Sequence, residues 1–102
     1  QRRDFLHAAD VAGALAHLLG AGIEGPVNIG SGRAVEVREM IGTLARALGR
    51  ENLVRLGARS RPADDPPLVE ADITRLASTG FRPRYDMESG IRAVIAAEGV
   101  PA

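Results

Sequence analysis

Hydrophobic positions recur at helical spacing in two stretches of the first half of the chain. The first predicts a helix that begins with Asp10 as its N-cap and ends at Gly20, with an apolar stripe of Val11, Leu15, Leu18 and Leu19. The second predicts a helix that Gly49 closes, with one apolar face formed by Val37, Met40, Ile41, Leu44 and Leu48. We therefore expect two helices here, each with one apolar face.

The second half of the chain holds two further helical patterns. Asp72 is expected to cap a short helix that Gly80 ends, and residues 81–83 are expected to form a turn. Asp86 is expected to cap the last helix, which is predicted to be buried through Met87, Ile91, Val94 and Ile95.

Extended segments are few and short. Residues 5–7 are expected to be extended, and residues 26–29 to form a strand that stops at a glycine turn. Residues 52–56 alternate apolar and polar side chains and predict a second strand, and residues 68–71 a brief third one. Residues 57–67 hold three prolines and no periodicity, which predicts a loop.

These elements predict an α/β fold, a small mixed lobe of about four helices and two or three short strands. So few strands do not make a self-sufficient doubly wound sheet. We therefore expect residues 1–102 to form a single domain that packs on a larger partner. The first residue is Gln1 rather than methionine, so we also expect a fragment of a longer protein.

Composition narrows the function classes. Hydrophobic residues make up 45% and charged residues 25% of the 102 residues, as in ordinary globular chains. Thirteen basic residues balance thirteen acidic ones, and aromatic residues are scarce, so we expect neither a nucleic-acid nor a membrane partner. The absence of cysteine excludes disulfides and thiolate sites and fits a cytoplasmic location.

Two arginines lie in distinctive local phrases. Arg3 follows Gln1-Arg2, and Arg61 opens Arg-Pro-Ala-Asp-Asp. Two fixed guanidinium groups on one small domain could clamp a diphosphate, because their planar forks match phosphate oxygens bidentately. The alternative is solvated surface, with Asp4 paired to Arg2 or Arg3 at little energetic gain.

Other polar groups are weaker candidates, and no catalytic residue is predicted. Residues 28–32 resemble a phosphate-binding loop, but Val35 stands at the third glycine position of Gly-x-Gly-x-x-Gly, which favours a plain turn. His7 lacks a partner that would make it a base and is expected to bond to backbone or lie exposed. Asp64 and Asp65 have no third ligand nearby, which favours loop acids over a metal site.

Five phrases, read in order, resemble the C-terminal part of the extended short-chain dehydrogenase/reductase family, the NAD-dependent nucleotide-sugar epimerases and dehydratases. Residues 1–12 are similar to Gln-x-Arg-Asp-Phe-x-His-Val-x-Asp-Val-Ala, residues 27–32 to Tyr-Asn-Ile-Gly-Ser-Gly and residues 61–64 to Arg-Pro-Gly-Asp. Residues 71–73 with 80–83, and the last helix, resemble the family's terminal phrases. The resemblance covers essentially the whole chain.

The resemblance implies a nucleotide-sugar-binding lobe of an NAD(P)-dependent epimerase, dehydratase or reductase. Arg3 and Arg61 would contact the substrate diphosphate, Val37 would pack beside the base, and Asp64 would lie near the ribose. The spacing between residues 61 and 72 leaves the ribose position open to Asp65 as well.

The family's Rossmann domain carries Gly-x-x-Gly-x-x-Gly and Tyr-x-x-x-Lys, which this chain lacks. The resemblance therefore places NAD(P) and hydride transfer in a missing N-terminal domain, with no cofactor, catalytic residue or metal on this chain. An exposed apolar patch is expected where that domain docks, with homodimerisation possible in isolation. The alternative is a stand-alone nucleotide-phosphate-binding or assembly module without catalysis.

Overall fold

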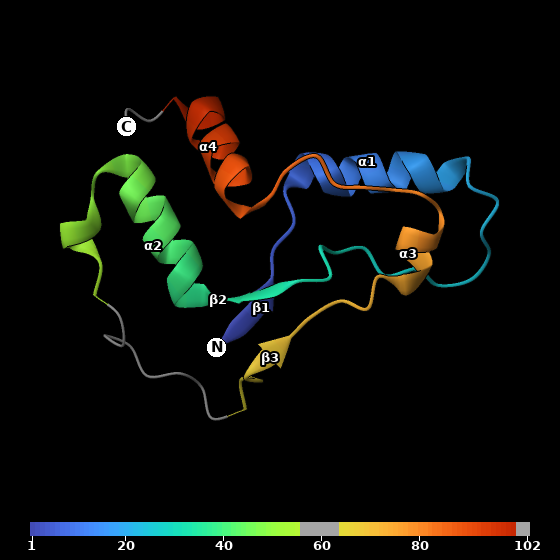
Figure 1. Cartoon of the computed structure of the whole chain (residues 1–102), viewed down its shortest axis with the longest axis horizontal. Coiled ribbons are helices and arrows are strands. Elements are labelled where there is room, and N and C mark those ends of the chain that lie inside the picture. The colour runs from blue at the N-terminus through green and yellow to red at the C-terminus, as the bar shows by residue number, and fades with distance from the viewer. Residues whose placement is uncertain (56–63, 100–102) are drawn as a thin grey trace.

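The computed structural model describes residues 1–55 and 64–99 (Figure 1). The sequence position of Arg61 lies outside these residues. In chain order the elements are β1 (Arg2–Asp4), α1 (Ala8–Leu19), β2 (Ala34–Glu36), α2 (Val37–Leu48), a 3-10 turn η1 (Glu51–Leu53), β3 (Leu68–Val69), α3 (Thr74–Ser78) and α4 (Met87–Glu98). The small α/β lobe predicted from the sequence is confirmed.

The sheet is mixed, with β1 between β2 and β3. Strand β2 runs antiparallel to β1 and places Val35 opposite Arg3, whereas β3 runs parallel and places Val69 opposite Arg3. Helix α2 continues directly from β2, so its first turn lies beside the start of β1 (Figure 1).

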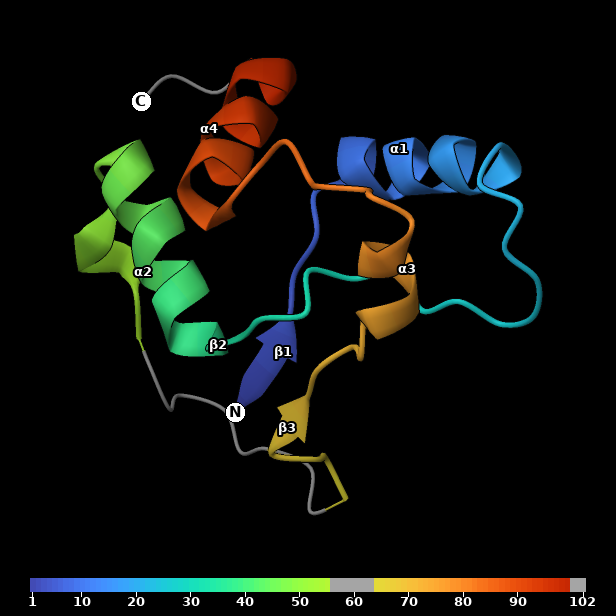
Figure 2. The ribbon, with the colours of Figure 1, turned by 45° about the vertical axis from the view of Figure 1, so that its right-hand side comes forward.

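The helices form two groups around this sheet. Helices α2 and α4 lie side by side, and α3 lies near α1 on the other side of the molecule (Figure 2). Helix α2 ends as predicted at Gly49, whose left-handed φ of 66° suits a residue without a Cβ. Asp86 caps α4 as predicted, and its carboxylate and Ser89 form a reciprocal capping box.

The predicted N-cap of the first helix is wrong. Helix α1 begins at Ala8, and its N-cap is His7, whose Nδ1 accepts a hydrogen bond from the Ala9 amide at 3.0 Å. Asp10 lies inside the first turn. Asp10 is only 2% exposed. It is occupied elsewhere, because its carboxylate accepts hydrogen bonds from the amides of Arg84 and Tyr85, at 2.8 and 3.0 Å.

The predicted strand at residues 26–29 is also wrong. The carbonyls of Glu24 and Pro26 accept hydrogen bonds from the Arg75 guanidinium, at 2.5 and 2.6 Å, instead of joining a ladder. Pro26 has no amide to donate. The sheet position is filled by β2, a segment that the sequence pattern did not single out.

Three smaller expectations need correction. Residues 51–53 form η1 and Val54 and Arg55 carry no strand, so the described part of the predicted strand at 52–56 is absent. Strand β3 is shorter than predicted. Ile73 is the N-cap of α3, while Asp72 accepts hydrogen bonds from the amide and hydroxyl of Thr74, so it still serves the start of that helix.

The apolar core of the described residues is thin. Ala14, Ala45 and Leu76 are its buried apolar side chains, whereas Val11, Leu15 and Leu19 on α1 are 36%, 54% and 91% exposed. Val94, predicted to be buried, is 50% exposed. The chain exposes 7404 Å², against about 5,500 Å² for a compact monomer of this size. None of the described helices is long and apolar enough to span a membrane.

Candidate functional site

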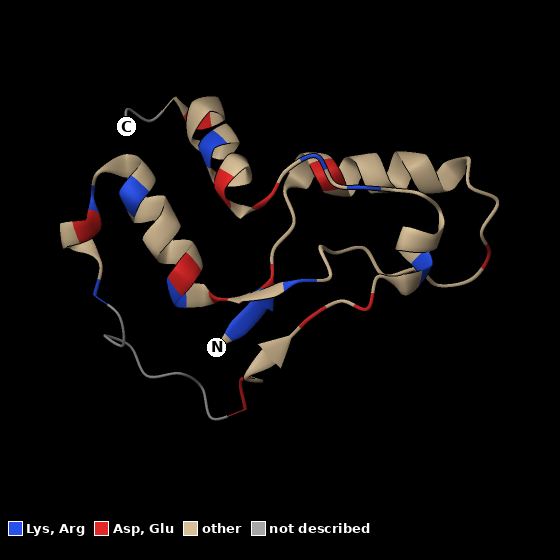
Figure 3. Ribbon diagram, in the orientation of Figure 1, with Lys and Arg blue, Asp and Glu red and all other residues tan. Residues whose placement is uncertain are grey.

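The start of β1 brings together a cation, an anion and an amide. The Nη2 of Arg3 donates a hydrogen bond to Oδ1 of Asp65 at 2.7 Å, and the side-chain amide of Gln1 donates to Oδ2 of the same carboxylate. The side chains of Arg3 and Asp65 are each 21% exposed. The basic strand β1 thus contacts the acidic segment, Asp64 and Asp65, that precedes β3 (Figure 3).

Val37 and Asp64 lie at this same end of the sheet. The Val37 amide donates to the Gln1 carbonyl at 2.9 Å, and the half-buried Val37 opens α2. Asp64 is exposed and adjoins Asp65 in the chain. The structure therefore gathers three of the four predicted substrate-binding residues around the start of β1, and the fourth, Arg61, lies outside the described residues. Their roles stay predictions.

The Arg3 guanidinium is oriented but not saturated. Its Nη1 donates to the Arg2 carbonyl at 2.7 Å, and its Nη2 to a single oxygen of Asp65. A guanidinium has five N–H donors in a fixed fork, so about three make no hydrogen bond to residues 1–55 or 64–99. The arrangement holds a cation in place and leaves donors for a further anion.

Asp4 occupies a different environment on the next position of β1. Its carboxylate accepts hydrogen bonds from the Ser31 amide and hydroxyl at 2.8 and 2.7 Å, from the Gly32 amide at 2.9 Å and from the Ala71 amide at 3.1 Å. Burial raises the pKa of Asp4, but these hydrogen bonds outweigh burial and leave the pKa below its usual value. Asp4 therefore ties two loops to β1, and the pairing with Arg2 or Arg3 that the alternative interpretation offered is not formed.

This cluster bears on the glycine turn at residues 30–32. Two of its amides point at an anion, as in a phosphate-binding loop, but that anion is the carboxylate of Asp4. The fit is tight, since a Cβ on Gly30 would lie 2.6 Å from the Ala71 Cβ. The interpretation as a plain structural turn is the one that the geometry favours.

His7 is hydrogen-bonded to the backbone, which confirms one of the two interpretations that the sequence left open. Its ring also stacks on Tyr85, with centroids 4.2 Å apart and planes 21° from parallel. The roles of Asp4, Asp10 and Asp65 were missed from the sequence. Asp10 gave one signal, an acid inside an apolar helical stripe, whereas the partners of Asp4 and Asp65 are distant in sequence.

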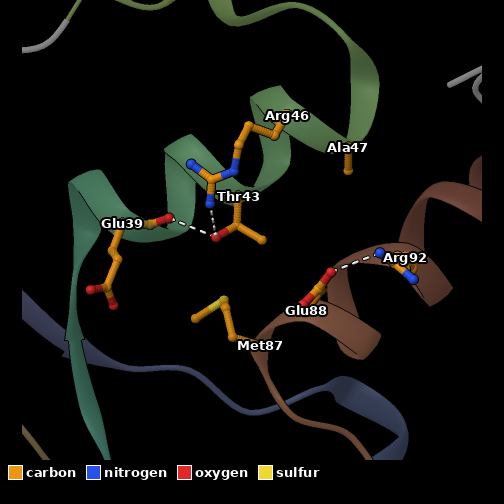
Figure 4. A pocket seen from close by; sticks show the side chains of 7 residues that line it. All are labelled: Glu39, Thr43, Arg46, Ala47, Met87, Glu88 and Arg92. Carbon is orange, nitrogen blue, oxygen red and sulfur yellow. Dashed lines mark hydrogen bonds and ion pairs between the residues drawn. The ribbon is translucent and has the colours of Figure 1, made fainter.

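Two hollows open on the surface, one away from β1 and one beside the Asp4 cluster. One of about 440 Å³ lies between α2 and α4, and its charges are split between Arg46, Arg92, Glu39 and Glu88 (Figure 4). In that hollow Arg92 is already paired with Glu88 at 2.7 Å. The other, of about 560 Å³, includes the carboxylates of Asp4, Glu70 and Asp72 and no basic residue, which disfavours an anionic ligand. Among the described residues no group of three potential ligands could hold a metal ion.

The chain is similar in sequence to known proteins of two kinds, GDP-L-fucose synthases and a UDP-glucose 4-epimerase. The chain is 36% identical over 91 residues to GDP-L-fucose synthase 1 of Arabidopsis thaliana and 36% identical over 93 residues to UDP-glucose 4-epimerase of Azospirillum brasilense. It is 30% identical over 99 residues to GDP-L-fucose synthase of Escherichia coli K12. No family model matches the chain.

Each similarity covers most of this chain and a small part of the relative. The matches span 87% of the chain but 27%, 26% and 30% of the three relatives. The names of all three contain a sugar joined to a nucleoside diphosphate, either GDP-L-fucose or UDP-glucose. A diphosphate is thus the chemical group that these names share.

The glycine turn at residues 30–32 does not fit the pyrophosphate of a dinucleotide. The glycine turn at residues 30–32 gives its amides to Asp4, so they are not free for a pyrophosphate. The hollow beside that turn is acidic and would repel one.

Proposed function

We propose that residues 1–102 form the C-terminal nucleotide-sugar-binding lobe of an NAD(P)-dependent epimerase, dehydratase or reductase, and that Arg3 binds the substrate diphosphate. The observation that carries this proposal is the oriented Arg3 guanidinium with donors left over. The similarity to enzymes named for GDP-L-fucose and UDP-glucose supports it. A cytoplasmic location belongs to the same proposal.

The other predicted residues would complete the substrate site. Val37 opens α2 beside Gln1 and offers an apolar surface for the base, and Asp64 is exposed near Arg3 and offers a carboxylate for the ribose hydroxyls. Arg61 would be the second diphosphate cation. Binding the diphosphate would place the sugar ring for reaction, because remote contacts supply orientation at the reacting centre.

Hydride transfer would take place on a separate N-terminal Rossmann domain. The apolar face of α1, formed by Val11, Leu15 and Leu19, is exposed and suits a docking surface. The surface in excess of a compact monomer, about 1,900 Å², is larger than the roughly 800 Å² that each partner buries in a standard interface. In isolation the same face could pair two copies of the lobe.

Calorimetric titration of the full-length natural protein tests this proposal. UDP, GDP, UDP-glucose and GDP-L-fucose are titrated, with glucose as a ligand that lacks the diphosphate. Arg3→Gln is expected to weaken binding of the preferred diphosphate ligand by about 10- to 100-fold, the cost of a charge-assisted contact.

Arg2→Gln is the matched control. Arg2 neighbours Arg3 on β1, but side chains alternate faces along a strand, and Arg2 is exposed. It is expected to bind within about twofold of the unchanged protein. Equal binding by the Arg3→Gln and Arg2→Gln variants, or no binding of any diphosphate, would sink the proposal.

A further inference from the structure

The Arg3 side chain, which the proposed function assigns to the diphosphate, already contacts an anion of this chain. Asp65 Oδ1 lies 2.7 Å from Arg3 Nη2, and Gln1 binds the other oxygen. We propose that Asp65 is an exchangeable counter-ion, which occupies the anion position beside Arg3 in the free protein and gives way to the diphosphate on binding. This inference rests on the proposed function.

The contacts of Asp65 are of a kind that can be exchanged. Both donors to its carboxylate among the described residues are side chains, Gln1 and Arg3, and each reaches a single oxygen. A guanidinium and a carboxylate bind more strongly when two parallel hydrogen bonds join them. The pair therefore uses Arg3 incompletely, and a diphosphate with more oxygens can use it more fully.

The backbone around Asp65 can stay in place during the exchange. The chain continues through Pro66 and Pro67, and the Pro67 carbonyl accepts a hydrogen bond from the Arg2 amide at 2.8 Å. This bond and the pairing of β1 with β3 anchor the segment. Rotation of the Asp65 side chain alone would release Arg3, without movement of the backbone.

Electrostatics make the two anions compete. A carboxylate at contact distance from Arg3 cancels most of its charge, and it repels a second anion brought to the same guanidinium. The pair is partly exposed, so water can solvate Asp65 once it leaves Arg3. The apparent affinity for the diphosphate is then proportional to the fraction of molecules in which Asp65 is not bound to Arg3.

The test compares UDP and GDP binding to the full-length natural protein and to Asp65→Asn, by calorimetric titration. The amide keeps the size of the side chain and removes its charge. Asp65→Asn is expected to tighten binding by about three- to fivefold, the range for a partly exposed ion pair. Asp65→Ser, which is also uncharged and shorter, is expected to act in the same direction.

Two controls isolate the contact with Arg3. Glu98→Gln removes one exposed acid from α4 and is expected to leave the affinity within about 1.5-fold. In the Arg3→Gln background, Asp65→Asn is expected to lose its effect, because the pair no longer exists.

Each result has a defined meaning. Unchanged or weaker binding by both Asp65 variants, with Arg3→Gln still impaired, overturns the counter-ion and leaves the proposed function standing. Equal binding by the unchanged protein and Arg3→Gln overturns both proposals, as does the absence of binding in every variant. A gain that persists in the Arg3→Gln background also overturns the counter-ion, since it would not act through Arg3.

Discussion

Two carboxylates differ in what holds them: Asp4, the last residue of β1, and Asp65, which contacts Arg3 of the same strand. Asp4 accepts hydrogen bonds from three backbone amides and one hydroxyl, whereas Asp65 accepts hydrogen bonds from two long side chains. Backbone donors in ordered turns cannot leave without disrupting the turns, but side-chain donors exchange by rotating. The comparison indicates that the Asp4 side of β1 is held by fixed backbone donors, whereas the Asp65 side is held by side chains that can exchange, as the proposed binding site requires.

The alternation of β1 produces this division. Neighbouring residues on a strand point to opposite faces, so Arg3 and Asp4 cannot serve the same face. The Asp4 face ties down the turn at residues 30–32 and the segment after β3, and the Arg3 face meets Asp65. A strand of three residues thereby joins a structural cluster to a candidate ligand site.

The largest expected difference is in stability. Asp4→Ala leaves several amides without their acceptor and is expected to lower the free energy of unfolding by about 3 kcal/mol. Asp65→Ala removes a partly exposed pair and is expected to cost less than about 1 kcal/mol. Urea unfolding of both variants measures the difference, and equal losses would break the comparison.

A smaller change within the Asp4 cluster sharpens the comparison between the two carboxylates. Ser31→Ala deletes the hydroxyl donor and keeps the amide, and is expected to cost about 1 kcal/mol. Diphosphate binding should be unaffected, because Ser31 serves the face opposite Arg3. Thermal unfolding and titration of the same sample check both statements, and weakened binding without lost stability would contradict them.

The pH dependence of stability should also single out Asp4. Its pKa is lowered in the folded state, so the carboxylate contributes stability above the unfolded pKa of about 3.9, and this stability is lost as the pH falls through the folded pKa. Asp72 and Asp86 act in the same direction, since hydrogen bonds from Thr74 and Ser89 lower their pKa values.

Urea unfolding between pH 6 and the acid transition tests this prediction. Asp4→Asn is expected to unfold with a shallower loss of stability on acidification than the unchanged protein. Asp65→Asn serves as the comparison. An identical pH profile for the Asp4→Asn variant and the unchanged protein would show that the Asp4 cluster does not couple to protonation.

The smallest expected effect is the salt dependence of the gain in diphosphate affinity that Asp65→Asn produces. Partly exposed charges are screened by added salt, with a Debye length of about 10 Å at 0.1 M. The threefold to fivefold gain of Asp65→Asn should therefore shrink towards unity as salt is raised to about 1 M. Titrations at several salt concentrations measure this, and a gain that grows with salt would oppose an electrostatic origin.

Local signals were sufficient to predict the long helices and their stops. Helix α2 follows from its apolar spacing and from Gly49, and α4 from Asp86 as a cap. Asp10 shows where local reasoning fails, because its carboxylate caps no helix and instead binds the amides of residues far along the chain. Residues 26–29 are likewise not a strand, and the Pro26 carbonyl bonds to the distant Arg75 side chain, a contact that periodicity does not reveal.

The sequence was sufficient to predict the cation of the candidate site, Arg3, but not its counter-ion, Asp65. Arg3 was identified by its phrase, and Val37 and Asp64 by resemblance. The contact between Arg3 and Asp65 joins positions 62 residues apart, and it depends on the parallel pairing of β1 with β3. Periodicity along one segment carries no information about such a contact.

A structure of the full-length natural protein with its preferred nucleoside diphosphate bound is the most direct test of the account. We predict an Arg3 guanidinium nitrogen about 2.8 Å from a diphosphate oxygen, with the Asp65 carboxylate rotated away from Arg3. A diphosphate bound elsewhere, with Arg3 and Asp65 still paired, would contradict the central claim.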